Sequence, residues 1–352
     1  MASQRYIIVG AGLAGCLIAW RLEQAGQHVT LIGSTQLPGA SEVAGGIINP
    51  VTGRWMTKSW QFDTCIEQAA QTYCELEKQF GIKLYHPVSF VRFCQNETDV
   101  KRIQRRMRNP RYANVLGDYN PVNKAQTTFN DKHGNFQIKQ AAHVELSLLL
   151  QTLRNHFTQQ KQFQDAVFVH DDLKKKHATW RYHDLEADHI VFCEGTGIRE
   201  NPWFKQLPLT PVKGETITFE CDTLELPQTI YHYGKWLLPV QSNQFRVGAT
   251  YDDRDLSEAP TETGKEQLLA SIRAFLHNQH APKIMQHTAG LRPCTQDFRP
   301  FVGSHPADTG IHVFNGLGSK GTLLAPEMVR RFLNYLLKGL PLDNEIDCKR
   351  YF

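Results

Sequence analysis

The hydrophobic positions of the first 33 residues predict a β-strand, a helix and a second strand. Residues 5–9 are mostly apolar, residues 13–25 place apolar side chains at helical spacing, and residues 29–32 form the next apolar run. Gly26 stands where a helix is expected to end. Three such elements within about 30 residues are typical of a βαβ unit in a parallel sheet.

The middle of the chain follows a different, alternating pattern. Residues 87–93 alternate between apolar and polar side chains, and a helix is expected to begin at Asn96 and to end before Pro110. Further short strands are expected at residues 136–138, 216–219, 236–240 and 245–249. Short strands separated by turn residues are typical of an antiparallel sheet, which we assign to a second domain.

The pattern of the first domain then returns. Its expected elements are a helix at 144–157, strands at 189–193 and 311–314, and a helix at 322–337. Residues 166–170 and 178–182 are expected to form a hairpin around the lysine run 174–176, which is interpreted as a solvated turn.

These patterns together predict an α/β fold, α+β overall, with two domains. Residues 1–85, 141–212 and 286–352 are expected to form a Rossmann-like dinucleotide-binding domain. Residues 86–140 and 213–285 are expected to form an inserted substrate domain with a mixed or antiparallel sheet.

The composition limits the class of protein without naming a function. Of the 352 residues, 41% are hydrophobic and 21% are charged, which is typical of a globular protein. No run of 18 apolar residues and no signal region is apparent, so we expect no transmembrane helix and a cytoplasmic location. The eight cysteines form no Cys-x-x-Cys pair, so we expect buried thiols in a reducing compartment and no bound metal.

One segment is strongly basic although the formal net charge is only +4. Residues 101–111 contain six lysines or arginines and no acid. Lys101, Arg105 and Arg108 share one helix face, and apolar residues share another. An amphipathic helix with a solvated basic side is the simpler interpretation. Contact with nucleic-acid phosphates is the alternative.

The turn after the first strand carries the motif Gly-x-Gly-x-x-Gly. Its residues are Gly10, Ala11, Gly12, Leu13, Ala14 and Gly15. The first glycine permits a tight turn, the second lets the backbone approach a pyrophosphate, and the third lets the helix pack on the strand. The helix N-terminus then presents free N–H groups and its positive dipole end to the phosphates. This context predicts dinucleotide binding.

The second strand lacks the acidic residue that usually binds the ribose hydroxyls at this point. Gly33 occupies that place, and Ser34 follows it. We therefore expect the ribose to be held by Ser34, by backbone groups or by water.

Seven further segments follow the glycine motif in a fixed order. They are Ser41-Glu42-Val43-Ala44-Gly45-Gly46, Asp171-Asp172-Leu173, Phe192-Cys193-Glu194-Gly195, Pro211-Val212-Lys213-Gly214-Glu215, Val247-Gly248-Ala249-Thr250, Gly290-Leu291-Arg292-Pro293 with Thr295 and Asp297, and Gly316-x-Gly318-Ser319-Lys320-Gly321. In this order they resemble the D-amino-acid oxidase family of FAD enzymes, which includes glycine and sarcosine oxidases. The resemblance covers nearly the whole chain.

The resemblance implies that FAD is bound without a covalent bond. The implied contacts, beside those of the first glycine motif, are Ser41, Ala44, Gly45 and Gly46 at the pyrophosphate and flavin, the backbone of Leu173 at the adenine, Glu194 and Gly195 at a strand end, and Gly316, Gly318, Ser319, Lys320, Gly321 and Thr322 in the closing flavin loop. Cys294 resembles the cysteine that carries the flavin in sarcosine oxidases. When the segments are aligned on Asp297, however, that position falls at Gly290.

The resemblance also implies a substrate site. Arg292 matches the arginine that clamps the substrate carboxylate in glycine oxidases, a task for which a planar guanidinium is suited. A structural arginine bound to loop carbonyls is the alternative. Lys320 would place a positive charge near N1 and the C2 carbonyl of the flavin, unless it is a surface lysine. Tyr231, Tyr233 and Tyr251 are expected to line the substrate pocket as well.

The loop after the flavin-contacting glycines adds a last pair of candidates. Contact of Asn49 or Arg54 with the flavin is one hypothesis, and a plain surface loop is the simpler interpretation. The oxygen-activating lysine of sarcosine oxidases corresponds to Arg246 here, which leaves rapid reaction with oxygen in question.

The function implied is the FAD-dependent oxidation of a C–N bond in an amine or amino-acid-like substrate, such as an N-substituted glycine. One alternative is the oxidation of a tRNA wobble-uridine side chain, because the Gly-Ser-Lys-Gly loop also resembles the FAD domain of the bifunctional tRNA wobble-uridine modification enzyme. A second alternative is an electron-transfer or redox-sensing flavoprotein without oxidase activity.

Overall fold

The computed structural model describes residues 3–36, 39–123, 128–277, 282–308 and 310–352. One of its two large sheets has six strands, in the order β11-β2-β1-β15-β22-β21. The bounds are Phe163–Gln164 (β11), His28–Ile32 (β2), Arg5–Val9 (β1), His189–Phe192 (β15), Ile311–Asn315 (β22) and Phe301–Ser304 (β21). Five strands run parallel and β21 runs antiparallel to β22. The expected βαβ unit and parallel sheet are confirmed.

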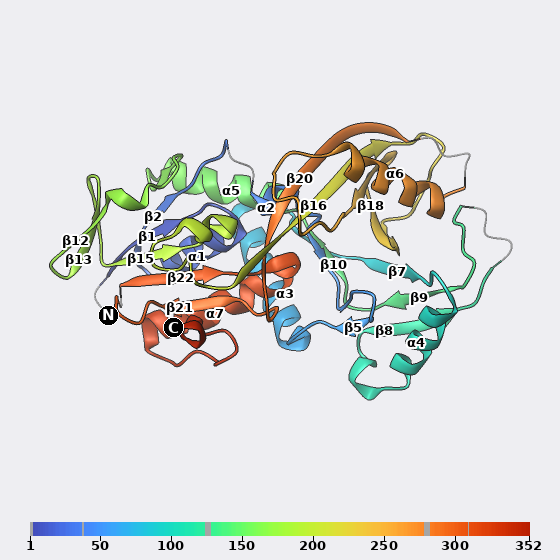
Figure 1. Cartoon of the computed structure of the whole chain (residues 1–352), viewed down its shortest axis with the longest axis horizontal. Coiled ribbons are helices and arrows are strands. Elements are labelled where there is room, and N and C mark those ends of the chain that lie inside the picture. Colours follow the sequence, from blue (N-terminus) through green and yellow to red (C-terminus); the bar gives the residue numbers. More distant parts are fainter. Residues whose placement is uncertain (1–2, 37–38, 124–127, 278–281, 309) are drawn as a thin grey trace.

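Four helices lie on one side of this sheet, and the small sheet of the predicted hairpin covers the other side (Figure 1). The four helices are Leu13–Gln24 (α1), Phe62–Phe80 (α3), Leu146–Gln159 (α5) and Gly321–Lys338 (α7). Helix α1 contacts β1 and β2 on one side and α5 and α7 on others, so it is buried along most of its length. This is why its sequence is apolar nearly all round, as expected for a helix enclosed by other elements.

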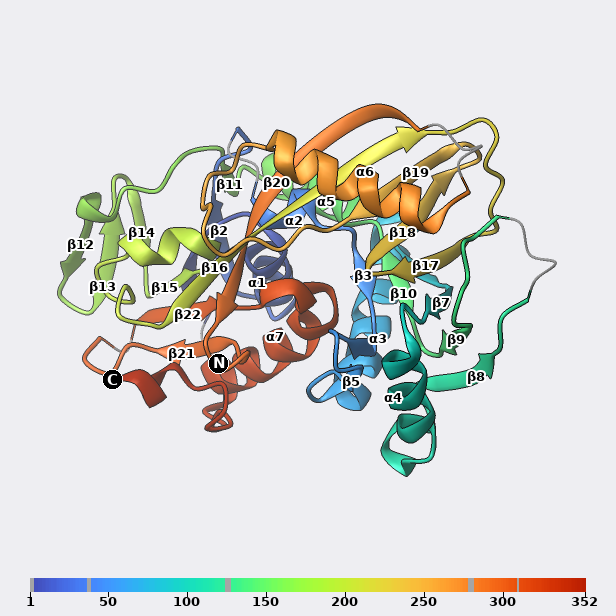
Figure 2. The same cartoon turned by 45° about the vertical axis from the view of Figure 1, so that its right-hand side comes forward.

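The second large sheet has eight strands, in the order β20-β16-β19-β18-β17-β7-β9-β8. The bounds are Lys283–Thr295 (β20), Leu209–Glu220 (β16), Gln244–Gly248 (β19), Lys235–Gln241 (β18), Thr229–Tyr233 (β17), Ser89–Phe93 (β7), Asn135–Ile138 (β9) and Leu116–Asn120 (β8). All neighbours pair antiparallel except β17 and β7, so the sheet is mixed, as expected. Helix α6 (Glu262–Phe275) lies over one face of it (Figure 2).

The remaining short elements connect the two sheets or decorate them. They are α2 (Ala40–Val43), β3 (Ile47–Ile48), β4 (Val51–Thr52), β5 (Thr57–Lys58), β6 (Tyr85–Pro87), α4 (Glu97–Met107), β10 (Ala142–Val144), β12 (Leu173–Lys176), β13 (Thr179–Tyr182), β14 (Leu185–Ala187) and the 3-10 turns η1 (Pro110–Tyr112), η2 (His170–Asp172), η3 (Gly195–Glu200), η4 (Gly318–Lys320) and η5 (Cys348–Tyr351). Helix α4 begins as expected, because the Asn96 side chain accepts a hydrogen bond from the N–H of Asp99 at 3.0 Å.

The predicted hairpin around the lysine run is wrong in its register. The lysines lie in strand β12, which pairs with β13 so that Leu173 faces Tyr182. The turn instead falls at His177, which has a positive φ of 57°. Phe168 belongs to no strand, and its ring stacks on Tyr182 at 4.2 Å. Burial of this aromatic pair keeps Phe168 beneath the hairpin rather than inside it.

The two longest strands link the two sheets. Strands β16 and β20 pair along their whole length and run from the first layer into the second (Figure 1). They cross the expected domain boundaries at 212/213 and 285/286, so the two-domain division stays a proposal in which both strands are shared. None of the helices in the described ranges combines the length and the apolar character that a membrane span needs.

Candidate cofactor and substrate site

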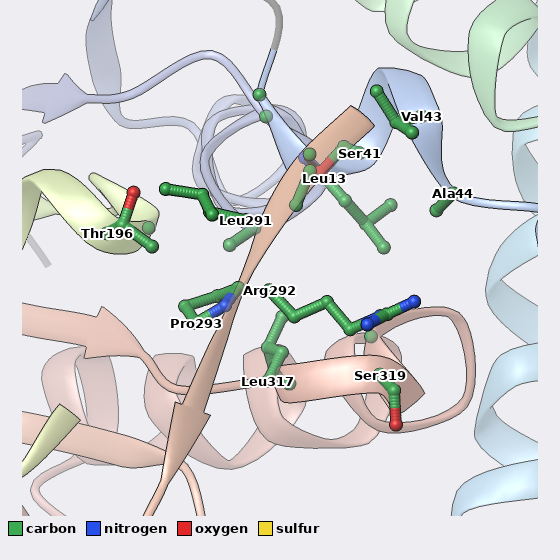
Figure 3. A pocket seen from close by; sticks show the side chains of 18 of the residues that line it. Leu13, Ser41, Val43, Ala44, Thr196, Leu291, Arg292, Pro293, Leu317 and Ser319 are labelled. Carbon is green, nitrogen blue, oxygen red and sulfur yellow. Dashed lines mark hydrogen bonds between the residues drawn. The ribbon is translucent and has the colours of Figure 1, made fainter. Parts of the chain in front are cut away.

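A cavity of about 840 Å³ is lined by residues of both sheets. The turn after β1, the segment 39–47, the end of β15, the strands β16, β18, β19 and β20, and the loop before α7 all contribute to its wall. Figure 3 shows Arg292 reaching from β20 into the space between Ser41, Val43 and Ala44 on one side and Leu317 and Ser319 on the other. Segments far apart in the sequence therefore meet at one site.

The glycine turn is fixed by close backbone packing. Gly10 has a φ of 105°, and a Cβ atom on it would lie 2.3 Å from the carbonyl oxygen of Cys193. A Cβ atom on Gly15 would lie 1.8 Å from the carbonyl oxygen of Gly10. Gly15 does not line the cavity, so its task is the close approach of helix and strand. No acidic residue stands in the first turn of α1, which leaves this N-terminus suited to a pyrophosphate.

The small-residue segment lies against the same turn. Ser41, Ala44, Gly45 and Gly46 all line the cavity, and the Ser41 hydroxyl accepts a hydrogen bond from the N–H of Leu13 at 3.1 Å. A Cβ atom on Gly45 would lie 2.8 Å from the Trp236 ring. The backbone here is therefore confined between α1 and the eight-stranded sheet.

Arg246 holds the end of α2 in place. Its guanidinium donates hydrogen bonds to the carbonyl oxygens of Val43 at 2.6 Å and Ala44 at 3.3 Å. Arg246 does not line the cavity. Since these bonds satisfy the free carbonyls of a helix C-terminus, Arg246 positions the segment that carries Gly45 and Gly46.

The closing loop is tied to the opposite wall. Gly316, Gly318, Ser319, Lys320, Gly321 and Thr322 all line the cavity. The Asn315 side chain donates to the Gly195 carbonyl at 2.8 Å and accepts from the Gly316 N–H at 2.7 Å. Glu194 and Gly195 thus face the same cavity as the loop that precedes α7.

Lys320 lies in the cavity wall at the N-terminus of α7. Burial lowers the pKa of its ammonium group, and the nearby charge of Arg299 lowers it further. Neither an acidic partner nor a side-chain hydrogen bond is found for this ammonium within the described ranges. A positive charge and the positive end of a helix therefore lie together at this point.

The expected backbone contact of Leu173 with the adenine has no support in the cavity lining. Its side chain is packed in the core beneath the six-stranded sheet and lies outside the cavity lining. Ala166, Val167 and Phe168 line the cavity instead, and Val167 is 60% exposed. The displaced hairpin register explains the difference, because it moves Leu173 into β12. Ser34 does line the cavity, and its hydroxyl accepts from the Gln36 N–H at 3.2 Å.

Arg292 lies on strand β20 and lines the cavity. Its guanidinium donates to the carbonyl oxygens of Lys213 and Thr250, both at 3.2 Å, and lies against Gly214, where a Cβ atom would be 1.9 Å from Nη2. Both interpretations of Arg292 thus have support, since the loop carbonyls use two of its five N–H donors. The other three donors have no partner in the described part of the chain. Burial lowers the pKa of this guanidinium.

The tyrosines divide between the two faces of the sheet. Tyr251 lines the cavity and is 67% exposed. Tyr231 is buried on the opposite face, where its ring centroid lies 4.7 Å from that of Phe129, so the expectation that it lines the pocket is wrong. Tyr233 points the same way and stacks on Phe275 at 5.3 Å. Successive strand residues alternate between faces, which explains the error.

The same alternation places two unpredicted residues in the cavity. His232 and Trp236 face each other across β17 and β18 and line the cavity. Burial, with the charge of Arg92, lowers the pKa of His232 to about 3, so its ring is neutral. Phe298, 74% exposed, and Glu258 also line the cavity without having been predicted. The alternation of side chains along β17 is the sequence signal that could have identified His232.

The loop at residues 49–54 contributes only Gly53 to the cavity lining. The Asn49 side chain accepts from the Val51 N–H at 2.9 Å, and Arg54 lies over the Trp55 ring at 4.9 Å. Neither Asn49 nor Arg54 lines the cavity, which favours the surface-loop interpretation over flavin contact. Local hydrogen bonding and a cation–π contact hold these side chains elsewhere.

The glycine turn, the closing loop and the mixed sheet define the class of an FAD-dependent oxidoreductase. Residues 5–330 match the family described as FAD dependent oxidoreductase, DAO, and the chain belongs to this family. FAD is its cofactor. The predicted family, fold class and cofactor are thereby confirmed.

Individual relatives point in the same direction. Glycine oxidase of Pseudomonas aeruginosa is 24% identical over 350 residues, covering 93% of each chain. Glycine oxidase of Bacillus subtilis is 36% identical over 147 residues, which is 41% of this chain and 39% of that protein. The tRNA 5-methylaminomethyl-2-thiouridine biosynthesis bifunctional protein of Marinobacter nauticus is 25% identical over 91% of this chain, but the match spans only 53% of that protein.

Solved structures share the whole fold. Glycine oxidase from Geobacillus kaustophilus has a TM-score of 0.81 at 19% identity and covers 99% of this chain and 98% of its own. Iminodiacetate oxidase from Chelativorans sp. BNC1 has a TM-score of 0.79 at 20% identity, with the same coverage. At these identities the likeness concerns the fold.

Proposed function

We propose that the protein oxidises a C–N bond of an amine or amino-acid-like substrate, with N-substituted glycines as the favoured class. The observation that carries this proposal is Arg292, whose three unpartnered donors enter the cavity opposite the closing loop. A carboxylate is the group that such a planar fork binds best. When bound, FAD accepts the two electrons and the hydrogen that leave the substrate carbon as a hydride.

The side chains around Arg292 have distinct tasks in this proposal. Arg292 binds and orients the carboxylate, so that the α-carbon lies toward the flavin. His232 is neutral and polar, so it accommodates a neutral amine without charge repulsion. The nitrogen lone pair forms the C=N bond as the hydride leaves, and water then hydrolyses the imine. No protein acid or base is needed if the amine binds in its neutral form.

An anaerobic substrate screen tests this proposal. We expect amines or N-substituted glycines, sarcosine and iminodiacetate among them, to bleach the flavin absorbance, while the hydroxy acid glycolate leaves it unchanged as a control. Bleaching by glycolate but by no amine would contradict the C–N assignment. Repeating each active case with oxygen and with a dye identifies the electron acceptor. Slow oxygen consumption with rapid dye reduction would favour an electron-transfer flavoprotein.

The FAD is proposed to be non-covalent and the compartment cytoplasmic. Cys294 lines the cavity, but burial raises the pKa of its thiol, which keeps it protonated and a poor nucleophile. The cysteines of the described residues are free, which suits a reducing compartment. Acid precipitation should release all of the flavin. Yellow colour that remains with the precipitated chain would contradict the proposal.

A second candidate substrate is a modified base in tRNA, because a basic surface adjoins the cavity loop. Arg102 donates to the Arg54 carbonyl and Arg92 to the Gly53 carbonyl, each at 3.0 Å, and Gly53 lines the cavity. Trp55, 56% exposed, lies between Arg54 and Arg102. Positive charge with an exposed aromatic ring is typical of surfaces that bind RNA.

Binding of unfractionated tRNA, measured by fluorescence anisotropy, separates this candidate from the first. Replacing Lys101, Arg105 and Arg108 by glutamine should weaken binding by about tenfold and reduce its salt dependence. The matched control replaces Lys174, Lys175 and Lys176, which lie on the distant hairpin β12–β13 (Figure 1). Equal losses in both variants would indicate non-specific attraction.

A further inference from the structure

The end of β2 cannot carry the acidic residue that normally binds the ribose of a dinucleotide. A Cβ atom on Gly33 would lie 2.6 Å from the amide nitrogen of Ala11 and 2.7 Å from its Cβ. Any side chain at position 33 would therefore displace the glycine turn. The next residue, Ser34, already accepts a hydrogen bond from Gln36. The strand that usually supplies the carboxylate thus supplies none.

A carboxylate and a guanidinium from two other elements meet beside this gap. Glu42 of α2 and Arg154 of α5 line the cavity together with Gly33 and Ser34, and they form an ion pair through Glu42 Oε1 and Arg154 Nη2. The side chains are 26% and 15% exposed. Arg154 Nε and Nη2 also donate to the Ala11 carbonyl at 2.9 and 2.6 Å. The pair is therefore fixed to the turn that receives the pyrophosphate.

The pair separates the main cavity from a smaller one. Glu42 and Arg154 line both cavities, and the second one is also lined by Thr35, which follows β2, and by Asp165, which follows the neighbouring strand β11. Glu42 Oε2 has no hydrogen-bond partner in the described residues. An unpaired carboxylate oxygen in an enclosed position costs free energy, and such positions are usually satisfied by a ligand or by water. Rotation about the terminal bond of Glu42 exchanges its two oxygens at little cost.

We propose that the Glu42–Arg154 pair binds the adenosine ribose hydroxyls of FAD, in place of the acid missing at position 33. A hydroxyl donates to a carboxylate and accepts from a guanidinium, so the pair matches both of its functions. The pyrophosphate cannot be the partner of Glu42, because two anions repel each other in a cavity of reduced dielectric. The ribose and the ribitol both flank the pyrophosphate with hydroxyl donors, and the position of the pair beside Gly33 and Ser34, where the ribose-binding acid usually stands, favours the ribose.

The dissociation constants of two ligands test this proposal without use of activity. One is FAD and the other is its analogue with a 2′,3′-dideoxyadenosine, each titrated into apoprotein and followed by quenching of flavin fluorescence. The wild type should prefer FAD by about 10- to 100-fold, as expected for charge-assisted hydrogen bonds. Glu42→Gln should reduce this preference to about threefold or less, because a neutral amide replaces the charge.

Two further variants keep the result interpretable. Glu42→Asp retains the charge but shortens the side chain, and it should lose much of the preference even if Glu42→Gln is unstable. Glu258→Gln removes another acidic side chain of the same cavity and should retain the full preference. If Glu42→Gln weakens both ligands equally and keeps their ratio, Glu42 only supports Arg154 and the proposal is wrong. A wild type that binds both ligands equally would also overturn it.

Discussion

The two ends of the cavity differ in the kind of groups that line them. The cofactor end consists of backbone and glycines, because Gly10 and Gly15 leave no room for a Cβ atom. The end that we propose for the substrate is lined by polar and aromatic side chains on separate strands, such as Arg292 on β20, His232 on β17 and Trp236 on β18. Arg292 lies there close enough to Lys235 that its charge, after burial, lowers the pKa of that ammonium. Damage at the first end should therefore affect folding and FAD together, whereas damage at the second should affect turnover alone.

The largest effect is expected from Gly10→Ala. The added Cβ would meet the Cys193 carbonyl at 2.3 Å, and the φ of 105° is unfavourable for alanine. We expect the free energy of unfolding, measured with urea, to fall by about 3–5 kcal/mol, and FAD to be lost on purification. Gly53→Ala is the matched control, since its φ is 69° but nothing lies within 4 Å of the new Cβ. If both variants lose the same free energy of unfolding, the positive φ alone causes the loss, and the contact with the Cys193 carbonyl contributes nothing.

The next effect sharpens the contrast, because Arg292→Met should spare the cofactor. FAD should remain bound, while kcat/KM for carboxylate-bearing substrates should fall by about 30- to 1000-fold, or about 2–4 kcal/mol. Amines without a carboxylate should change much less. Equal losses for both classes would show that Arg292 only holds the carbonyls of Lys213 and Thr250.

The same contrast explains which parts of the site the sequence could predict. The glycine turn and the closing loop are local features, since each needs only a few consecutive residues to be recognised. The lining of the substrate end depends on strand faces and register, where an error of one residue reverses the side chain. The sequence therefore predicts Tyr231 in the cavity, whereas its neighbour His232 lines the cavity and Tyr231 faces the other way. Leu173 lies outside the cavity lining because aromatic packing of Phe168 on Tyr182 shifts the hairpin.

Some contacts had no sequence signal at all. The ion pair between Glu42 and Arg154 joins residues 112 positions apart, and no spacing rule relates them. Arg246 of β19 caps α2 although it lies 203 positions after the carbonyl of Val43 that it binds. The large parallel sheet, by contrast, was predictable, because apolar runs of about five residues separated by glycine turns are compatible with few other structures.

Lys320→Met is expected to have a moderate effect at the junction of the two ends. Removing the charge should weaken binding of sulfite to the flavin and lower its reduction potential, by an amount worth about 1–2 kcal/mol. FAD should stay bound, because the glycine turn is untouched. The measurements are a sulfite titration of the flavin absorbance and a dye-equilibration potential. Unchanged values would mean that the N-terminus of α7 acts alone.

The smallest effect concerns a side-chain contact at the cofactor end, where backbone otherwise dominates. His170 Nε2 lies 2.7 Å from Glu194 Oε1, and the two side chains are 19% and 10% exposed. This hydrogen bond raises the pKa of His170 above its usual 6.5, with a smaller contribution from the charge of Asp171. A raised pKa stabilises the fold fully below pH 6.5, and the stabilisation disappears as the pH rises through the folded-state pKa.

We therefore expect the free energy of unfolding of the wild type, relative to His170→Asn, to decrease by about 0.5–1 kcal/mol between pH 6 and pH 9. His183→Asn is the matched control, because His183 lies 3.5 Å from Asp172 in an exposed pair, where solvent screens the interaction. If the wild type and His170→Asn show parallel pH profiles, the charge of His170 contributes nothing, and the cofactor end depends on its backbone alone.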